Sequence, residues 1–380
     1  MQYPRKSLSL AALGLGLVVA ACQWIVGIDG DLRVAAPERD AGADASTDGG
    51  VPDPCRTEGI PSVPANATPG GDISIVFALR SLDFGIDGGA PVGLNLDGRC
   101  TCPGPESCRA PGAVPCDQER GIDNASRDLL AEVFGRGVLD QPTINGALQD
   151  GIFGALVQVD GWNGEPDDAH VSVQVFASQG FDQKAVPGRS QPVFDGKDVW
   201  TVDDESVDRS VDGGPPYVSK ALDDSAFVAG GALVSTLSFP IIVGSNSTSR
   251  VRIKVGDGRL FATIRTEKAL GDAGVQYSLQ GTLAGRWRAS DLLGSLASLN
   301  DPITGAPICG DSGVYQLVKS QVCARLDIPA QGSNDDLGQS CSAVSLGAKF
   351  VAVNAKLGSQ QPKPDSGGGC GPTWSDTCGP

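Results

Sequence analysis

Histidine is almost absent from this chain of 380 residues, since His170 is the only one. Zinc or iron sites that need several imidazole ligands are therefore excluded. The sequence also lacks the EF-hand pattern D-x-[DN]-x-[DN]-G and a phosphate-binding loop. It thus offers no ready-made motif for calcium or for nucleotides.

Basic and aromatic residues are also scarce. The chain has 29 Lys and Arg against 45 Asp and Glu, and aromatic residues make up 5% of it. The resulting net charge of −16 repels the phosphate backbone, so nucleic acid is excluded as a partner. Glycine and proline are abundant, with 52 and 26 residues, and predict many turns. A hydrophobic content of 40% still allows a sizeable core.

The first 21 residues have the features of a secretory signal. Arg5 and Lys6 precede an apolar run from Leu8 to Ala21, which ends in small residues. This run of about 14 residues is shorter than the roughly 20 that a membrane-spanning helix needs. An uncleaved N-terminal anchor is the alternative, and the body is expected to be exported in either case.

The end of this segment, Val19-Ala20-Ala21-Cys22, resembles the lipobox of bacterial lipoprotein precursors. The resemblance implies that a peptidase cuts before Cys22 and that its thiol is acylated, which anchors the protein to a membrane. In such lipoproteins a residue other than Asp after the cysteine, here Gln23, favours the outer membrane. We therefore expect a location in the bacterial cell envelope.

Composition divides the chain into four parts. Residues 1–21 are the signal, and residues 22–68, rich in Asp, Ala, Gly and Pro, are typical of a disordered linker. Residues 69–357 are expected to form a disulfide-stabilised body. Residues 358–380 form a low-complexity tail.

The cysteines predict a disulfide framework. Setting Cys22 aside leaves 10 of the 11, an even number that suits an oxidising compartment. On loop length alone, we expect Cys309 to pair with Cys323 and Cys370 with Cys378. A cluster with the spacing C-x-C-x5-C-x7-C leaves a zinc site as the competing interpretation. It consists of Cys100, Cys102, Cys108 and Cys116.

Alternation of apolar and polar residues predicts a mainly β body. The longest alternation, 275–287, predicts a long strand with one buried face. Gly281 and Gly285 on that face predict a close backbone approach or a bulge. Two runs, 251–255 and 259–265, are joined by Gly-Asp-Gly and predict a hairpin.

Helices are expected to be few. They are predicted after Asn124, around Leu292 to Leu299 and from Ser312 to Cys323. Many strands without regular strand–helix alternation predict an antiparallel β-sandwich or jelly roll. The sandwich or jelly roll is expected to carry the short helices and a cysteine-rich insertion.

The segment Cys309-Gly310-Asp311-Ser312-Gly313 resembles the nucleophile segment of chymotrypsin-like serine proteases. The resemblance implies Ser312 as nucleophile and His170 as its base. It covers about five residues, and Val314 stands where that family has another glycine. The alternative is that Ser312 caps a helix and His170 is a surface residue on a strand.

Two groups of acidic residues accompany tryptophans. Trp162, Glu165 and Asp167 lie in one predicted loop, and a second acidic group follows Trp200. Sugar-binding and sugar-cleaving proteins combine an aromatic platform with carboxylates, so a glycan site is one interpretation of these residues. The interpretation that we favour is that they form acid-rich turns of an acidic secreted protein. The second group consists of Asp203, Asp204, Glu205 and Asp208.

Oxygen-bearing side chains flank the cysteine cluster, where disulfides would gather them. Hard oxygen ligands suit calcium, which is the one cofactor that the sequence suggests. Turn and cap positions explain the same residues without a metal. The candidate ligands are Asp97, Asp117, Asp123 and Asn124.

None of these patterns identifies a catalytic centre. We therefore expect a lipid-anchored envelope protein without enzymatic activity, which has a structural role or binds a glycan or protein ligand. The alternative is a tethered hydrolase that acts on extracellular polysaccharide or peptide.

The lipid anchor is directly testable in cells. Globomycin, which blocks the lipoprotein peptidase, is expected to make the precursor accumulate, and labelled palmitate is expected to enter the wild type. Cys22→Ala should remove the label. Normal processing of an unlabelled wild-type protein would contradict the prediction.

Overall fold

The computed structural model describes the body of the protein. The chain divides into two units, Met1–Asp48 and Gly49–Pro380, and all described residues belong to the second. Cys22 and the rest of the N-terminal 59 residues lie outside them. The described residues are 60–102, 106–112, 115–134, 140–211, 214–244, 250–267, 275–296, 299, 305–306, 308–310, 312–336, 338–362, 370 and 376–378.

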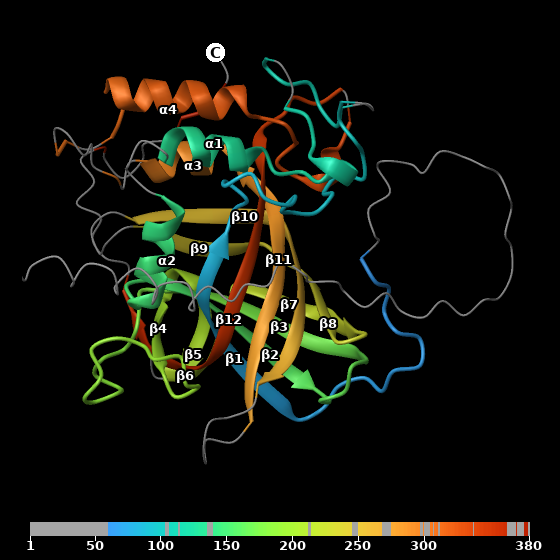
Figure 1. Cartoon of the computed structure of the whole chain (residues 1–380), viewed down its shortest axis with the longest axis vertical. Helices are drawn as coiled ribbons and strands as arrows, with labels where there is room; N and C mark the ends of the chain where they lie inside the picture. Colours follow the sequence, from blue (N-terminus) through green and yellow to red (C-terminus); the bar gives the residue numbers. More distant parts are fainter. Residues whose placement is uncertain are drawn as a thin grey trace, which may run out of the picture. The chain divides into compact units, whose positions relative to one another are not determined.

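Eight antiparallel strands form a closed barrel (Figure 1). Around the barrel the order is β1, β2, β3, β7, β8, β10, β11 and β12, and β12 pairs back with β1. The strands are β1 (Ile73–Asp83), β2 (Gly154–Trp162), β3 (Asp168–Ser178), β7 (Ala221–Ala229), β8 (Ala232–Thr236), β10 (Arg250–Glu267), β11 (Gln276–Arg288) and β12 (Ala343–Gln361).

The prediction of a mainly β body is confirmed, but the sandwich or jelly roll is wrong. Val76 of β1 pairs with Gln158 of β2 on one side and with Ala355 of β12 on the other. The first barrel strand in sequence is therefore hydrogen-bonded to the last, and the sheet closes on itself. A sandwich would leave both strands as edges of two separate layers.

Apolar side chains fill the inside of the barrel. Phe77, Val173, Leu233 and Leu279 are all fully buried there and belong to one continuous cluster. An eight-stranded barrel is just wide enough for its interior to be filled by side chains. The interior is thus a packed core.

Two further strands extend this sheet. Strand β9 (Phe239–Gly244) pairs with the first half of β10, and β4 (Val199–Asp203) runs parallel to the end of β12. A separate hairpin, β5 (Val207–Val211) with β6 (Gly214–Ser219), packs outside the barrel. It helps to cover a second, smaller core, here called the outer cluster, which consists of Ala78, Leu156, Phe176, Trp200, Val202, Val207, Tyr217 and Ala355.

The predicted hairpin at Gly256-Asp257-Gly258 is wrong. Both halves of β10 pair with β11 in the same direction, and the register shifts only between Gly256 and Arg259. The three residues therefore form a bulge within one strand, in which Asp257 has a φ of 43°. Glycine and aspartate suit such a bulge as well as a turn, so their presence alone did not distinguish the two.

The long strand predicted over residues 275–287 is confirmed as β11. Leu279, Leu283 and Trp287 are buried, as the alternation predicts. A Cβ atom on Gly281 would overlap the Phe261 carbonyl oxygen of β10, which confirms the predicted close approach.

Four α-helices accompany the barrel: α1 (Ala125–Phe134), α2 (Gln141–Gln149), α3 (Ala289–Leu296) and α4 (Gly313–Ala324). Figure 1 shows α1, α3 and α4 together at the end of the barrel where β11 finishes and β12 begins. They form a helical cap over this end. Short 3₁₀ turns lie at Glu119–Gly121, Asp204–Ser206 and Gly332–Asn334.

Local sequence fixes where these helices begin. The side chain of Ser312 accepts a hydrogen bond from the Tyr315 N–H, and Asp140 caps α2 in the same way. The predicted N-cap role of Ser312 is confirmed. In the part of the chain that the structure describes, no helix is long and apolar enough to cross a membrane.

Candidate functional site

The tryptophan of the first predicted glycan site is part of the core. Trp162 is 7% exposed, packs edge-to-face on Tyr277 and donates its indole N–H to the carbonyl oxygen of Glu165 at 3.0 Å. Glu165 and Asp167 are exposed in the β2–β3 loop, and the Asp167 carboxylate accepts from the Gly230 N–H at 2.7 Å. These residues shape the loop, and the indole offers no open face for a sugar.

The second tryptophan lies on the other side of the sheet. Trp200 is 1% exposed in the outer cluster, between Phe181 and Phe194. Asp203 is fully buried and forms an ion pair of 2.5 Å with Arg252, which also pairs with Glu205 at 3.1 Å. The structure therefore does not bring the two tryptophans into one site. Asp203 and Glu205 of the second acidic group are engaged by Arg252.

The predicted calcium ligands do not form a metal cage. Asp123 is 3% exposed, and its carboxylate accepts from the Leu96 N–H at 2.6 Å. The Asn124 amide points elsewhere, because it donates to the Val92 carbonyl oxygen at 2.8 Å and accepts from the Gly347 N–H at 3.0 Å. Among the described residues, no group of three or more His, Cys, Asp and Glu side chains is arranged to hold a metal ion.

The protease-like pair is not assembled. Ser312 lies at the start of α4, in the helical cap, and its hydroxyl is engaged as the N-cap. His170 is exposed near the start of β3, beside the β2–β3 loop, and its backbone N–H donates to the Asp168 carboxylate at 3.0 Å. The strand order places this loop at the other end of the barrel from the cap. Asp311, the third residue of the motif, lies outside the described residues.

Disulfide bonding is confirmed for the cysteines predicted to form it, but the two predicted pairings are wrong. Cys309 pairs with Cys370 and Cys323 with Cys378. The reason is α4, which is about 18 Å long and has Cys309 before its start and Cys323 at its end. Bonded cysteines have Cα atoms within about 7 Å of each other. Both ends of α4 are thus tied to the C-terminal segment, part of the predicted tail.

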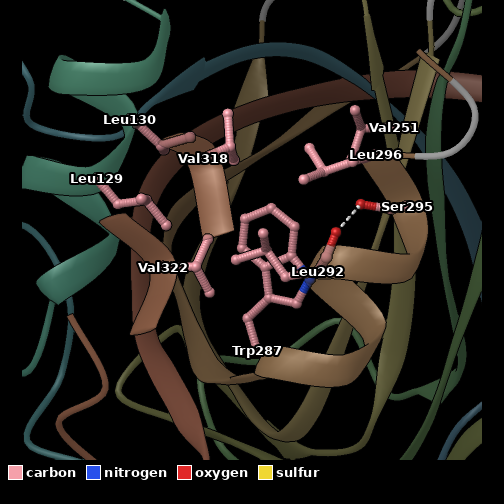
Figure 2. Close-up of a pocket in the computed structure, with 9 residues that line it drawn as sticks. All are labelled: Leu129, Leu130, Val251, Trp287, Leu292, Ser295, Leu296, Val318 and Val322. Atoms are coloured by element: carbon pink, nitrogen blue, oxygen red, sulfur yellow. Dashed lines mark hydrogen bonds between the residues drawn. The ribbon is translucent and has the colours of Figure 1, made fainter. Parts of the chain in front are cut away.

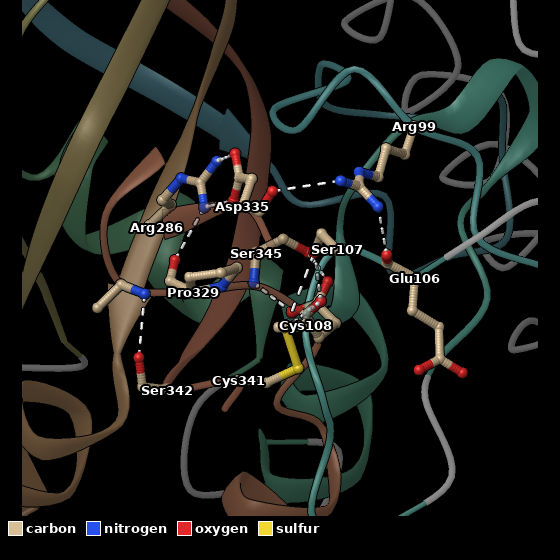
Figure 3. The surroundings of a disulfide bond; sticks show 12 residues. Arg99, Glu106, Ser107, Cys108, Arg286, Pro329, Asp335, Cys341, Ser342 and Ser345 are labelled. Atoms are coloured by element: carbon tan, nitrogen blue, oxygen red, sulfur yellow. Dashed lines mark hydrogen bonds and ion pairs between the residues drawn. A yellow bond between two sulfur atoms is a disulfide. The ribbon is translucent and has the colours of Figure 1, made fainter. Parts of the chain in front are cut away.

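The cysteine cluster is oxidised, and not a zinc site. Cys102 pairs with Cys116, and Cys108 pairs with Cys341 just before β12. Cys100 is also disulfide-bonded. Figure 3 shows the Cys108–Cys341 bond. It joins the cysteine-rich segment, the described residues from 94 to 123, to the residues just before β12.

Sequence reasoning missed a buried arginine near this disulfide. Arg286 of β11 is 1% exposed and forms a bidentate ion pair with Asp335, in which both N–O distances are 2.7 Å (Figure 3). It also donates to the carbonyl oxygens of Pro329 at 2.9 Å and Leu96 at 3.3 Å. One guanidinium therefore holds two connecting segments, the one around Leu96 and the one between α4 and β12, against the end of the barrel.

Two of the hollows in the described structure are candidates for a ligand site. The first is an apolar cavity of about 20 Å³ between the helical cap and the barrel (Figure 2). It has room for about one water molecule. The buried indole N–H of Trp287 lies at its wall and has no protein partner among the described residues. The remaining wall residues are Leu129, Leu130, Val251, Leu292, Ser295, Leu296, Val318 and Val322.

The second hollow is an open groove of about 450 Å³ on the outer wall of the barrel. Pro215 and Pro216 of β6 line it together with residues of β1, β2 and β12. Its lining from the barrel strands is Ser74, Ile75 and Val76 of β1, Gln158 of β2, and Asn354, Ala355, Lys356 and Leu357 of β12.

Polar groups of this groove are held in place by one carboxylate. Asp160 accepts from the Ser74 hydroxyl at 2.5 Å and from the Gln158 amide at 2.8 Å, and Gln174 of β3 donates to it at 3.1 Å. The side-chain amide of Gln158 must therefore turn its NH₂ group toward Asp160. The Ser74 hydroxyl and the Gln158 amide at the edge of the groove are thus held in fixed orientations by Asp160.

Comparison with known proteins assigns no family and no function to this chain. No family model, curated protein or solved structure matches the chain. The site must therefore be judged from its own geometry.

The buried arginine gives a stability test. Arg286→Ala leaves Asp335 and two carbonyl oxygens without their donor, and we expect a loss of about 3 to 5 kcal/mol in unfolding free energy. Arg288→Ala removes an exposed arginine two residues further along β11 and should cost less than about 0.5 kcal/mol. Denaturant titration of both variants measures the difference. Equal stability of the two variants would refute the role given to Arg286.

Proposed function

We propose that this protein is a non-enzymatic binding protein of the bacterial cell envelope, anchored through a lipid on Cys22. The signal-like N-terminus and the lipobox-like Val19-Ala20-Ala21-Cys22 support the anchor. The disulfides support an oxidising, extracytoplasmic compartment. The open groove on the outer wall is the observation that carries the binding role.

The chemistry of the groove favours a glycan as the ligand. Ser74 places a hydroxyl beside the apolar surfaces of Val76 and the two prolines. Gln158 and Asn354 also line the groove, with their amide groups engaged by Asp160 and by the Tyr277 N–H. A sugar ring presents the same combination, since its C–H faces are apolar and its edges carry hydroxyls. The exposed Lys356 adds one cation, which suits a glycan that carries carboxylate or phosphate groups.

Binding is favoured over hydrolysis by the composition of the groove. A glycosidase generally needs two carboxyl groups about 5 to 10 Å apart on either side of the scissile bond. The described lining of the groove contains no Asp or Glu, and Asp160 beside it is engaged by three donors. The groove therefore lacks the paired acid and base of that mechanism.

A charge reversal in the groove tests this proposal. Lys356→Glu is expected to weaken binding to acidic glycans on a bacterial glycan array at least about tenfold, because it replaces attraction by repulsion. Lys254→Glu is the matched control, since Lys254 is also an exposed lysine on a strand, 62% exposed in its side chain and outside the groove lining. Both variants should keep the wild-type melting temperature.

Two results would contradict the proposal. One is equal glycan binding by both variants and the wild type. The other is release of reducing sugar from a bound polysaccharide by the wild type, which would favour the tethered hydrolase.

A further inference from the structure

Arg80 is an exposed arginine at a bulge of β1, on the outer wall of the barrel. The register between β1 and β12 shifts between Leu79 and Ser81, so Arg80 is the extra residue of the bulge. Its guanidinium carbon lies 5.4 Å from the centroid of the Phe194 ring, which is the geometry of a cation–π contact. The ring thus supports a side chain that is otherwise open to solvent.

The loop between β3 and β4 fixes Phe194 in this place. The Phe194 ring packs on Trp200, with 6.2 Å between the ring centroids. The buried Asp198 carboxylate accepts from the Phe194 N–H at 2.5 Å, and the Phe194 carbonyl oxygen accepts from the Gln276 side chain at 2.9 Å. The φ of Phe194 is 56°, a left-handed conformation that bulky residues rarely adopt and that clusters at ligand sites.

No acid neutralises Arg80 in the part of the chain that the structure describes. The ion pairs between described residues are all made by other cations. Asp195, in the same loop as the aromatic ring, pairs with Arg189 at 2.7 Å. Asp83, further along β1, accepts from the Gly85 N–H at 2.8 Å. The N–H groups of the Arg80 guanidinium therefore stay available to an external anion, although the net charge of the chain is −16.

A second cation lies near Arg80 on the same wall. Lys349 of β12 is opposite Asp83, and Val351 is opposite Ser81. Lys349 is thus the diagonal neighbour of Ser81, at about 7 to 8 Å between Cα atoms. It also takes no part in the described ion pairs. Charge complementarity therefore favours a ligand with two or more negative groups.

The wall beside these cations is a sheet face that carries polar side chains. Ser81, Val351, Gln280 and Thr263 lie directly opposite one another on β1, β12, β11 and β10, and each is partly exposed. The row is about 14 Å long, since adjacent strands lie about 4.8 Å apart. Its hydroxyl and amide groups follow a line across the strands. A chain of sugar rings, which carries hydroxyls along its whole length, matches this row.

We propose that Arg80, stacked on Phe194, and Lys349 form a second glycan site, here called the wall site, which binds an acidic polysaccharide across β1, β12, β11 and β10. Arg80 binds a carboxylate or phosphate group in a bidentate contact, and Lys349 binds a second charge. The sugar hydroxyls lie along the polar row. The wall site shares no lining residue with the groove, so either site can exist without the other.

NMR titration of the isotope-labelled mature protein tests the wall site. Trigalacturonic acid, which carries carboxylates, and mannose 6-phosphate are the probes, and a shift of the Ser81, Gln280 and Val351 amides with either of them is expected. Maltotriose, which is uncharged, should leave these amides unchanged. Failure of both acidic sugars to shift them would overturn the proposal. Equally tight binding of inorganic phosphate would also contradict a glycan site.

A pair of arginine variants identifies the anion-binding group. Arg80→Gln is expected to raise the Kd measured from the wall amides at least about tenfold, because a charge-assisted bidentate contact is lost. Arg288→Gln is the matched control, since it removes an exposed arginine at the end of β11 and changes the net charge equally. It should change this Kd less than about twofold, because distant surface charges are screened. An equal Kd for the two variants would refute the assignment.

The role of the ring is tested separately. Phe194→Leu keeps the charge of Arg80 but removes the stacking partner, so an intermediate increase in Kd is expected. Arg80→Lys, which keeps a charge without a planar fork, should give a similar increase and serves if Phe194→Leu fails to fold. A wild-type Kd in Arg80→Lys would contradict the stacked geometry.

The same titration separates the wall site from the groove. Lys356→Glu is expected to leave the Kd of the wall amides unchanged, and Arg80→Gln should leave shifts of the Ser74 and Val76 amides unchanged. Loss of the groove shifts alone would contradict the proposed function and leave the wall site intact. Loss of the wall shifts in Lys356→Glu would show that the two sites are not separate.

Discussion

The backbone hydrogen bonds between β1 and β12 connect two strands that are far apart in the sequence, and they close the barrel. Closure removes two sheet edges that would otherwise be open to pairing with other chains. It also defines an inside, which apolar side chains fill, and an outside, which carries the groove. The groove itself lies at this closure, since residues of both β1 and β12 line it.

The capped end of the barrel depends more on polar interactions than the apolar barrel interior does. Two connecting segments converge on Arg286, and the Cys108–Cys341 disulfide ties residues 94–123 to the residues just before β12. Acids that are abundant in the composition are used here as acceptors for backbone N–H groups. This use satisfies buried donors.

Local structure could be predicted from the sequence, because it depends on neighbouring residues. The alternation over 275–287 predicted β11, and Ser312 predicted the start of α4. The closed barrel could not be predicted in this way. A period of two shows that a strand has one buried face, yet it does not show which strand pairs with which.

The functional residues were harder to predict for the same reason. Arg286 falls in the polar phase of β11, where an exposed side chain is expected, and only the loops around Leu96 and Pro329 bury it. Loop length suggested a bond between Cys309 and Cys323, but the helix between them keeps them apart. The groove combines β1, β2, β6 and β12, and no local pattern relates residues so distant in sequence.

Closure of the barrel is tested most directly by amide exchange along β1. In a closed barrel β1 is paired on both sides, so consecutive N–H groups from Val76 to Leu79 should all be strongly protected. An edge strand would instead show alternating slow and fast exchange, because every second N–H would face solvent. Uniform protection is the result that the closed barrel predicts, and alternation along β1 would contradict it.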